Sequence, residues 1–366
     1  SEAPALLVGA AAFAVFIGWF FRSVRGRNAR TGCSQRAVDS VTQAALGAAI
    51  GGAIAPSGQR RKALLAGAAL GTLPDQDVFI DYGDAVANFT YHRGFSHSLF
   101  VLPPFALLLW FALRRWWAPV REEPARWLAI IGLALITHPL LDAHTAYGTQ
   151  LFWPLEPAPA MWATLFIIDP LYTLPLLVGV AIVAARPGKR ASATAIRACL
   201  ALSTLYVGWS WLAQSIVARH TEQALAERGL SAAPVFIVPS PFNTVLWRVV
   251  VQTEQGYLEG FDSLLSSEDN LDFTAHTFDR ALLDSASDVW AVSRLRWFAR
   301  DFVKAGIEDD RLLITDLRMG QEPIYVFTHV VAERGNPHWQ PLHTELISPA
   351  IDERVLLDAW KRMWTH

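Results

Sequence analysis

Long apolar runs constrain this chain more than any other feature. A bilayer-spanning helix needs about 20 predominantly apolar residues, and five stretches come close to this length: Ala5–Phe21, Ser98–Trp117, Pro124–Leu141, Trp162–Ala185 and Ala195–Val217. Only 17% of the 366 residues are charged, whereas globular domains average about 25%. These observations predict a polytopic helical membrane domain. Because arginines follow the first run and do not precede it, we expect an uncleaved transmembrane helix and not a signal peptide.

Two weaker apolar segments, Val41–Ala55 and Ala63–Leu73, are rich in alanine and glycine. Small residues allow helices to approach closely in a bilayer. The second segment is too short to cross, so it is expected to be partly buried or re-entrant. The sequence does not determine how residues 1–62 pass through the membrane.

Basic residues gather at one set of helix ends. Lysine and arginine are concentrated in residues 22–36, 60–62, 114–126 and 186–190, whereas residues 74–97 hold only Arg93 and residues 142–161 hold none. The positive-inside rule places the basic ends in the cytoplasm. Residues 74–97, 142–161 and everything after about 218 are then extracytoplasmic.

The chain changes character after residue 217. Charge rises and period-two patterns predict strands, with a hairpin turn at Glu254–Gly256 and further strands within 311–320 and 323–334. Residues 277–302 have helical spacing. We therefore predict a mainly α protein with three parts: an N-terminal helix and basic linker (1–38), a helical membrane domain (39–217) and an extramembrane α+β domain with an antiparallel sheet (218–366).

Ionisable residues cluster at the ends predicted to be extracytoplasmic. Asp75, Asp77 and Asp81 follow the short apolar segment, and His92 and His97 precede a span. A further pair, His138 and Asp142, has the i, i+4 spacing that places both side chains on one helix face. Asp169 lies inside the fourth apolar run.

Imidazole and carboxylate ligands together suit zinc, manganese or iron, and several carboxylates favour a site with more than one ion. Two such ions can bind a phosphoester and generate hydroxide near neutral pH. The chain has no His-Glu-x-x-His motif, which disfavours a zincin protease. Cys33 and Cys199 are too few for a cysteine zinc site, and a net charge of −2 gives no indication of nucleic-acid binding.

Each of these residues also has a structural interpretation. An interfacial histidine is usually a hydrogen-bonded structural residue, "PDQD" is an ordinary turn with a helix cap, and His138 with Asp142 makes a plausible ion pair. Their joint occurrence at one membrane face favours a metal site, since ionisable residues at the membrane are functional candidates by default.

Other residues have roles that the sequence leaves open. Asp169 could bind metal, orient a ligand or cap a helix, and Arg93 could bind a phosphate oxygen or extend to the interface. Tyr147 is a candidate for substrate or transition-state contact. In the tail, four residues could cap the site and select substrate, or could form a buried Arg–Asp network: Trp247, Arg248, Asp316 and Arg318.

Several motifs together resemble the YdjM-like family of membrane-bound, metal-dependent hydrolases. The resemblance rests on "DSVTQAALGAAIG" (39–51), "GTLPDQD" (71–77), "HRGFSHS" (92–98), "HPLLDAHTAYGTQLFWP" (138–154) and "FIIDPLYTLPLL" (166–177), with "PFNTVLWR" (241–248) and "TDLRMG" (315–320) in the tail. The family sits in bacterial and archaeal cell membranes and is grouped with phospholipase C and P1 nuclease-like zinc hydrolases. The resemblance implies metal-ligand roles for six residues: Asp75, Asp77, His92, His97, His138 and Asp142.

The resulting hypothesis is an inner-membrane hydrolase with two or three divalent ions, zinc before manganese or iron. A metal-bound hydroxide would cleave a phosphoester of a lipid or lipid-linked substrate at the extracytoplasmic face. Two alternatives use the same residues: a metal-ion transporter, which needs access from both sides, and a non-catalytic membrane protein with a structural metal site.

Overall fold

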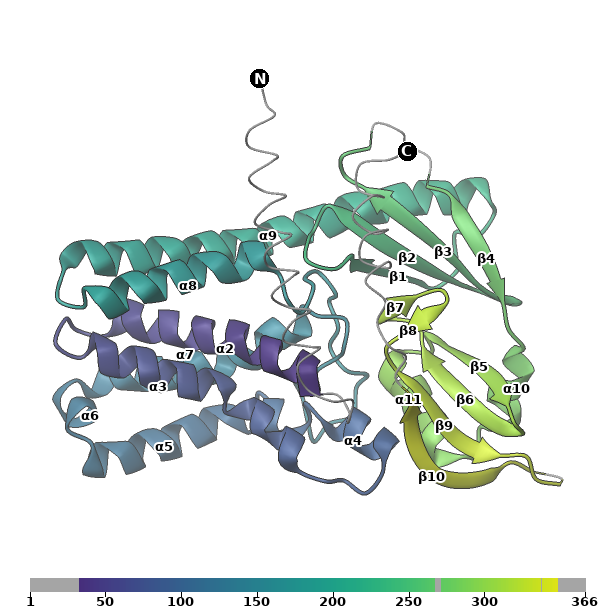
Figure 1. Cartoon of the computed structure of the whole chain (residues 1–366), viewed down its shortest axis with the longest axis horizontal. Helices are drawn as coiled ribbons and strands as arrows, with labels where there is room; N and C mark the ends of the chain where they lie inside the picture. Colours follow the sequence, from purple (N-terminus) through teal and green to yellow (C-terminus); the bar gives the residue numbers. More distant parts are fainter. Residues whose placement is uncertain (1–32, 267–270, 337, 348–366) are drawn as a thin grey trace. The chain divides into compact units, whose positions relative to one another are not determined.

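The structure is a computed structural model that describes residues 33–266, 271–336 and 338–347. The predicted span Ala5–Phe21 lies outside these residues. The chain divides into two units, 1–41 and 42–366, and the account below concerns the second. Its described part combines apolar helices with antiparallel sheets (Figure 1), which confirms the predicted fold class.

The helices of residues 33–227 precede the sheets in the chain. They are α2 (Cys33–Ile54), α3 (Arg60–Thr72), the 3-10 turn η1 (Pro74–Phe79), α4 (Ala85–Tyr91), the 3-10 turn η2 (Phe95–His97), α5 (Leu102–Trp116), α6 (Ala118–Glu122), α7 (Pro124–Ala143), α8 (Pro170–Ala185) and α9 (Arg190–Glu227). By length and composition, α7 and α9 could cross a membrane. A third candidate is the bent pair formed by residues 85–97 and α5, which meet at 58°.

The predicted spans match the helices unevenly. The run 124–141 coincides with α7, and α9 contains the run 195–217 but extends at both ends. The run 162–185 was predicted as one span, yet its helix begins only at Pro170, because Asp169 caps it by accepting hydrogen bonds from the amides of Leu171 and Tyr172.

Glycines allow α2 and α3 to form a close antiparallel hairpin. A Cβ added at Gly47 would lie 2.1 Å from the carbonyl oxygen of Gly67, and one at Gly71 would lie 2.4 Å from that of Gln43. Both distances are too short for any side chain, so the backbones can touch only where residues lack a Cβ. This contact fixes Gln43 against the end of α3.

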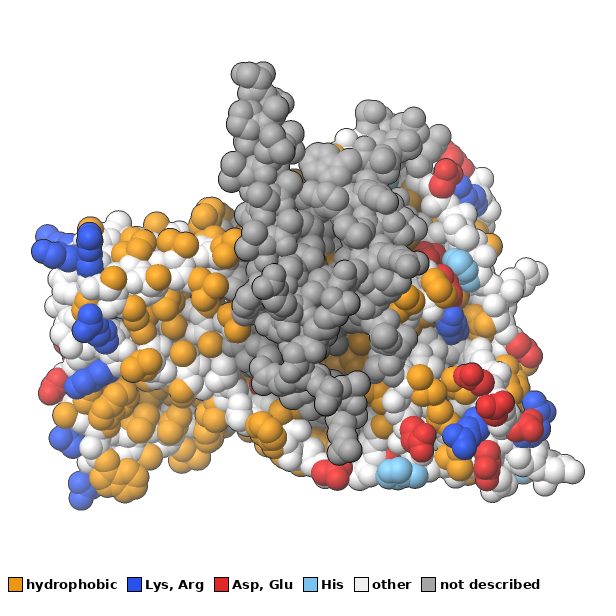
Figure 2. Space-filling view, in the orientation of Figure 1, with side chains coloured by type: hydrophobic (Ala, Val, Ile, Leu, Met, Phe, Trp, Pro, Cys, Tyr) orange, Lys and Arg blue, Asp and Glu red, His pale blue; other side chains and the backbone are white. Residues whose placement is uncertain are grey.

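The basic residues share one end of the helices. Gln59, before α3, donates to Glu122, the last residue of α6, and Arg60 donates to the carbonyls of Pro187 and Lys189 between α8 and α9. Figure 2 shows blue side chains gathered at this end, with hydrophobic side chains covering the helices beside it. The opposite ends of α3 and α7 carry the predicted metal ligands.

Two four-stranded antiparallel sheets follow α9. The first has the order β1-β2-β3-β4: β1 (Val235–Pro239), β2 (Leu246–Thr253), β3 (Gly256–Ser263) and β4 (Phe273–Thr277). The second has the order β10-β9-β6-β5: β5 (Val303–Glu308), β6 (Arg311–Asp316), β9 (Thr328–Glu333) and β10 (Gln340–Ile347). The hairpin turn predicted at Glu254–Gly256 is confirmed, since Thr253 pairs with Gly256.

The tail departs from its predicted secondary structure in one segment. Residues 277–302 were predicted as one helix, but they end β4 and then form α10 (Arg280–Ser285) and α11 (Trp290–Ala299). Asp279 caps α10 by accepting from the amide of Ala281, and this cap starts a new element inside the predicted helix. The small hairpin of β7 (Gly320–Gln321) and β8 (Ile324–Tyr325) completes the described tail.

The sheets pack directly on the segments that lead to the candidate site. One hydrophobic core joins Val86 and Phe89 of α4 to α11 and the second sheet, and another joins Met161 and Ala163 to the first sheet. The amide of Val86 donates to Thr344 Oγ1 at 2.9 Å. The predicted division at 217 stays a prediction, because α9 runs across it.

Candidate metal centre

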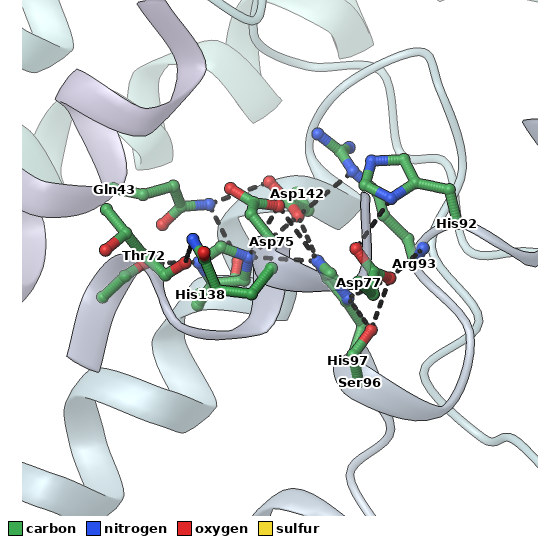
Figure 3. Close-up of polar contacts among 12 residues, drawn as sticks. Gln43, Thr72, Asp75, Asp77, His92, Arg93, Ser96, His97, His138 and Asp142 are labelled. Carbon is green, nitrogen blue, oxygen red and sulfur yellow. Dashed lines mark hydrogen bonds and ion pairs between the residues drawn. The ribbon is translucent and has the colours of Figure 1, made fainter. Parts of the chain in front are cut away.

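Four of the predicted ligands converge from three elements. Asp75 comes from η1, His97 from η2, and His138 and Asp142 from the last turns of α7. One ligand atom from each lies within 4.8 Å of the others, and Figure 3 shows these side chains pointing toward one another. His97 Nε2 lies 3.0 Å from both His138 Nε2 and Asp142 Oδ2. Asp75 Oδ1 lies 3.3 Å from His138 Nε2 and 3.5 Å from His97 Nε2.

Hydrogen bonds orient both imidazoles toward this centre. His138 Nδ1 is 2.6 Å from the carbonyl oxygen of Gly71, which can only accept, so Nδ1 carries a proton. Ser96 Oγ donates to Asp77 Oδ2 at 2.6 Å and therefore accepts from His97 Nδ1 at 2.9 Å. Both Nε2 atoms consequently face two carboxylates, as in metal sites where the remote imidazole nitrogen is held by an acceptor.

The spacing fits one tetrahedral ion. Metal bonds of about 2.0–2.1 Å give a tetrahedron with edges of about 3.3 Å. Five of the six distances among these four atoms run from 3.0 to 3.5 Å, and the sixth, between Asp75 and Asp142, is within 4.8 Å. Protons on the Nε2 atoms can supply the counter-charge without an ion, and a cation would displace them. The donor set of two imidazoles and two carboxylates suits a divalent ion such as zinc.

Asp142 is held from two sides. Gln43 Nε2 donates to its Oδ1 at 2.8 Å, and Arg93 Nε lies 3.3 Å from its Oδ2. Arg93 adopts φ = +60°, a region that non-glycine residues seldom occupy and that is often found at functional sites. With neutral histidines, Asp75, Asp142 and Arg93 sum to −1, so a divalent ion would leave the centre with a net positive charge.

Asp77 and His92 lie beside the cluster and not in it. Asp77 Oδ1 accepts from His92 Nδ1 at 2.9 Å, and its Oδ2 accepts from the amide of Arg93 at 3.0 Å. Asp77 therefore closes the loop that carries His97, and it fixes the His92 ring. The six predicted ligands thus separate into a four-ligand cluster and an Asp77–His92 pair.

Both η1 carboxylates are held in the charged form. Burial alone would raise the pKa of Asp75, but attraction from His138 and hydrogen bonds from His138 and His97 outweigh burial and place that pKa well below its usual value. Burial would also raise the pKa of Asp77. The hydrogen bond from His92 and the attraction of the His92 charge outweigh burial, so the pKa of that carboxyl is lowered. Anionic carboxylates are the form that binds metal.

Solvent reaches the cluster from one side. The His97 and His138 side chains are completely buried, whereas the Asp75 side chain is 16% exposed and that of His92 is 22% exposed. A substrate would therefore approach between Asp75 and His92.

The predicted catalytic residues are placed differently. Tyr147 lies beside His92, but its hydroxyl donates to the Phe89 carbonyl at 2.6 Å. Asp169 caps α8 and accepts from Tyr206 at 2.9 Å, so its carboxylate serves the helix start and the contact with α9. No contact among the described residues links Asp169 to the cluster.

The four predicted substrate residues of the tail are buried. Trp247 donates to the Thr244 carbonyl, and Arg248 bonds to Glu259 Oε1 at 2.7 Å and to the Leu317 carbonyl. Arg318 Nη2 lies 2.5 Å from Asp316 Oδ2. This burial supports the alternative interpretation of an internal Arg–Asp network, because side chains enclosed in this way offer no surface to a substrate.

Two supporting residues were not among the predicted site residues. Gln43 sits in an alanine- and glycine-rich helix that carries no other chemical signal, and Ser96 lies between two more conspicuous histidines. The spacing of Ser96 from His97 gives no indication of its bond to Asp77. The glycine-rich run "AALGAAIGG" was the one available signal, since close backbone contact brings the adjacent Gln43 to the site.

Two comparisons with known proteins match the chain to inner membrane proteins. The sequence model described as YdjM inner membrane protein matches residues 38–217, which contain all the residues of the cluster. Over 117 residues the chain is 37% identical to "Inner membrane protein YbcI" of Escherichia coli (strain K12). That match covers 31% of this chain and 64% of the relative, so the chain spans less than two thirds of its length. No solved structure matches the chain. Over residues 38–217 the chain is therefore similar to the YdjM inner membrane protein family.

Proposed function

We propose that this protein is a membrane-embedded, metal-dependent hydrolase that cleaves a phosphoester of a lipid or lipid-linked substrate. One observation carries the proposal. The Nε2 atoms of two buried histidines and the oxygens of two carboxylates converge within 4.8 Å, with both Nδ1 atoms committed to acceptors. Two imidazoles and two carboxylates that face one point are the donor set of a divalent-ion site.

A bound divalent ion would polarise a phosphoryl oxygen and lower the pKa of a water molecule. The chain's own residues supply proton transfer and positive charge beside the substrate. Asp77 holds the Nδ1 proton of His92, which leaves His92 Nε2 free to take or give a proton at the exposed edge of the cluster. Arg93 fixes Asp142 and adds positive charge beside the position of an anionic substrate. The structure supports one ion more directly than the two or three predicted.

The surroundings favour a lipid substrate. The loops beside the cluster expose Phe95, Phe100, Phe152, Trp153 and Leu155. Residues 94–101 and 143–155 contain no Asp, Glu, Lys or Arg. Aromatic side chains of this kind occupy the bilayer interface, where phospholipid phosphates lie. We further propose that this face is extracytoplasmic, since the basic ends of the helices lie opposite it.

The test is hydrolysis of defined lipids by the purified, metal-loaded protein. Phospholipids, phosphatidic acid and a polyprenyl phosphate would be compared in mixed micelles. We expect turnover of at least one, a loss of more than about 100-fold in His138→Ala, and a loss of about 100-fold or more in His92→Gln with metal retained.

His220→Ala serves as the control, because His220 pairs with Asp262 in a separate histidine–carboxylate contact. It should keep wild-type turnover. Equal turnover in wild type and His138→Ala, or no turnover of any of these lipids by the loaded protein, would contradict the proposal.

A further inference from the structure

Tyr147 connects the C-terminal sheets to the candidate metal centre. Arg318, at the end of β6, is fully buried and paired with Asp316. It uses Nη1 to donate to the main-chain carbonyl of Tyr147 at 2.9 Å. These two residues come from different halves of the chain, so the bond fixes the loop after α7 to the second sheet.

The Tyr147 side chain faces the site. Its ring lies 5.0 Å from the Arg93 guanidinium and 5.7 Å from the His92 ring. Stacking on an aromatic face holds a guanidinium in one orientation. Arg93 in turn lies 3.3 Å from Asp142 Oδ2, the oxygen that faces both histidines of the cluster.

The other side of the ring rests on the tail. Tyr147 packs on Phe298 of α11 and on Phe327, with ring centroids 5.5 and 5.9 Å away. Its hydroxyl bonds to Phe89 of α4, the helix that leads into His92 and Arg93. Arg294 of α11 also donates to Thr90 of that helix at 3.0 Å. Both segments that flank the Arg93–Asp142 contact are thus supported by the C-terminal domain.

From these contacts we infer that Tyr147 is a positioning residue through which the C-terminal domain sets the geometry of the metal centre. The inference rests on the proposed metal site. Tyr147 acts through Arg93 on Asp142 and contacts no substrate. The tail then contributes to ion binding through Arg318, although none of its described residues belongs to the cluster.

Metal affinity and the visible spectrum of bound Co²⁺ test this inference without any assay of turnover. Tyr147→Leu removes the ring beside Arg93, and we expect about 10-fold weaker Co²⁺ binding with an altered absorption band. Tyr147→Phe keeps the ring and loses only the hydroxyl, so it should restore the spectrum and most of the affinity. The double variant Asp316→Asn/Arg318→Met, which leaves no unpaired buried charge, should also bind Co²⁺ about 10-fold more weakly.

Phe236→Leu is the matched control. Phe236 is a buried aromatic residue of β1 that packs on Phe302, and neither residue belongs to the four-residue cluster. This variant should lose stability through a cavity yet keep native affinity and spectrum. Native Co²⁺ binding in Tyr147→Leu, or equal losses in Tyr147→Leu and Phe236→Leu, would overturn the positioning role and leave the metal site standing. Absence of Co²⁺ binding in the wild-type protein would overturn both.

Discussion

Asp75 and Asp77 stand two positions apart and have different partners. They lie on a 3-10 turn, where each residue advances by about 120°. Asp75 therefore faces His97 and His138, while Asp77 faces His92 and Ser96. The family resemblance implied metal-ligand roles for both, and only the local helix type separates them. The i, i+4 pair His138 and Asp142 was predictable, because an α-helix places both on one face.

Gln43 provides a direct residue-scale prediction. Gln43→Leu removes the hydrogen bonds to Asp142 Oδ1 and to the His138 carbonyl. We expect metal affinity, measured by competition with a chelator, to fall about 10-fold. Gln59→Leu, at the other end of the same hairpin, removes bonds to Trp127 and Glu122. It should reduce stability and leave affinity intact. Unchanged affinity in Gln43→Leu would show that Asp142 needs no such support.

His329 predicts how stability depends on pH. It is completely buried in the second sheet, and neither ring nitrogen has a hydrogen-bond partner among the described residues. Burial lowers its pKa to about 4, against weaker opposing attraction from Asp316 and Asp84. Between pH 6.5 and 4 the unfolded chain therefore binds a proton that the folded protein does not, so acidification favours unfolding. From pH 7.5 to 5 this costs about 2 kcal/mol.

Thermal unfolding in detergent at both pH values checks this prediction. His329→Leu should lose less stability on acidification than the wild type does. His338→Leu, at an exposed position, should retain the wild-type pH dependence. The same pH dependence in His329→Leu as in the wild type would argue against a buried neutral histidine.

At the scale of elements, the α2–α3 hairpin connects helix packing to the site. Its close contact positions Gln43 beside Asp142 and places the Gly71 carbonyl under His138 Nδ1. The glycine and alanine content predicted close packing, but it could not identify the partner helix, since any small-residue surface would serve. The start of α8 was not predicted either, because hydropathy does not register the cap formed by Asp169.

Gly47→Ala tests this connection. The added Cβ would meet the Gly67 carbonyl at 2.1 Å, so the helices must separate. We expect a loss of about 1–3 kcal/mol in stability, together with weaker metal binding. Gly132→Ala in α7 adds a Cβ into open space and should affect neither quantity. A Gly47→Ala protein with native melting temperature and affinity would rule out the close contact.

At the scale of the whole molecule, the sequence predicted a helical membrane domain and an antiparallel α+β tail, because hydropathy and period-two patterns report burial directly. It could not predict how the tail contacts the site, which depends on pairs as distant as Tyr147 and Arg318. Such pairs leave no local pattern. The four residues of the cluster stood out in the sequence because each lies at the end of an apolar segment, where an ionisable residue is costly.

The orientation of the whole molecule is a separate prediction. With the basic ends cytoplasmic, the sheets lie outside. A reporter enzyme that is active only outside the cytoplasm should be active when fused at the C-terminus and inactive when inserted after Gly188, between α8 and α9. The reverse pattern would invert the proposed topology.

The most direct test of the central claim is the metal content of the detergent-purified protein, measured by mass spectrometry beside a His97→Ala/His138→Ala double variant. A tetrahedral four-ligand centre predicts about one divalent ion per chain in the wild type and none in the variant. His220→Ala, with its histidine outside the cluster, should retain the ion. A native protein that stays metal-free after incubation with zinc, manganese or iron, or a double variant that keeps its full metal content, would contradict the claim.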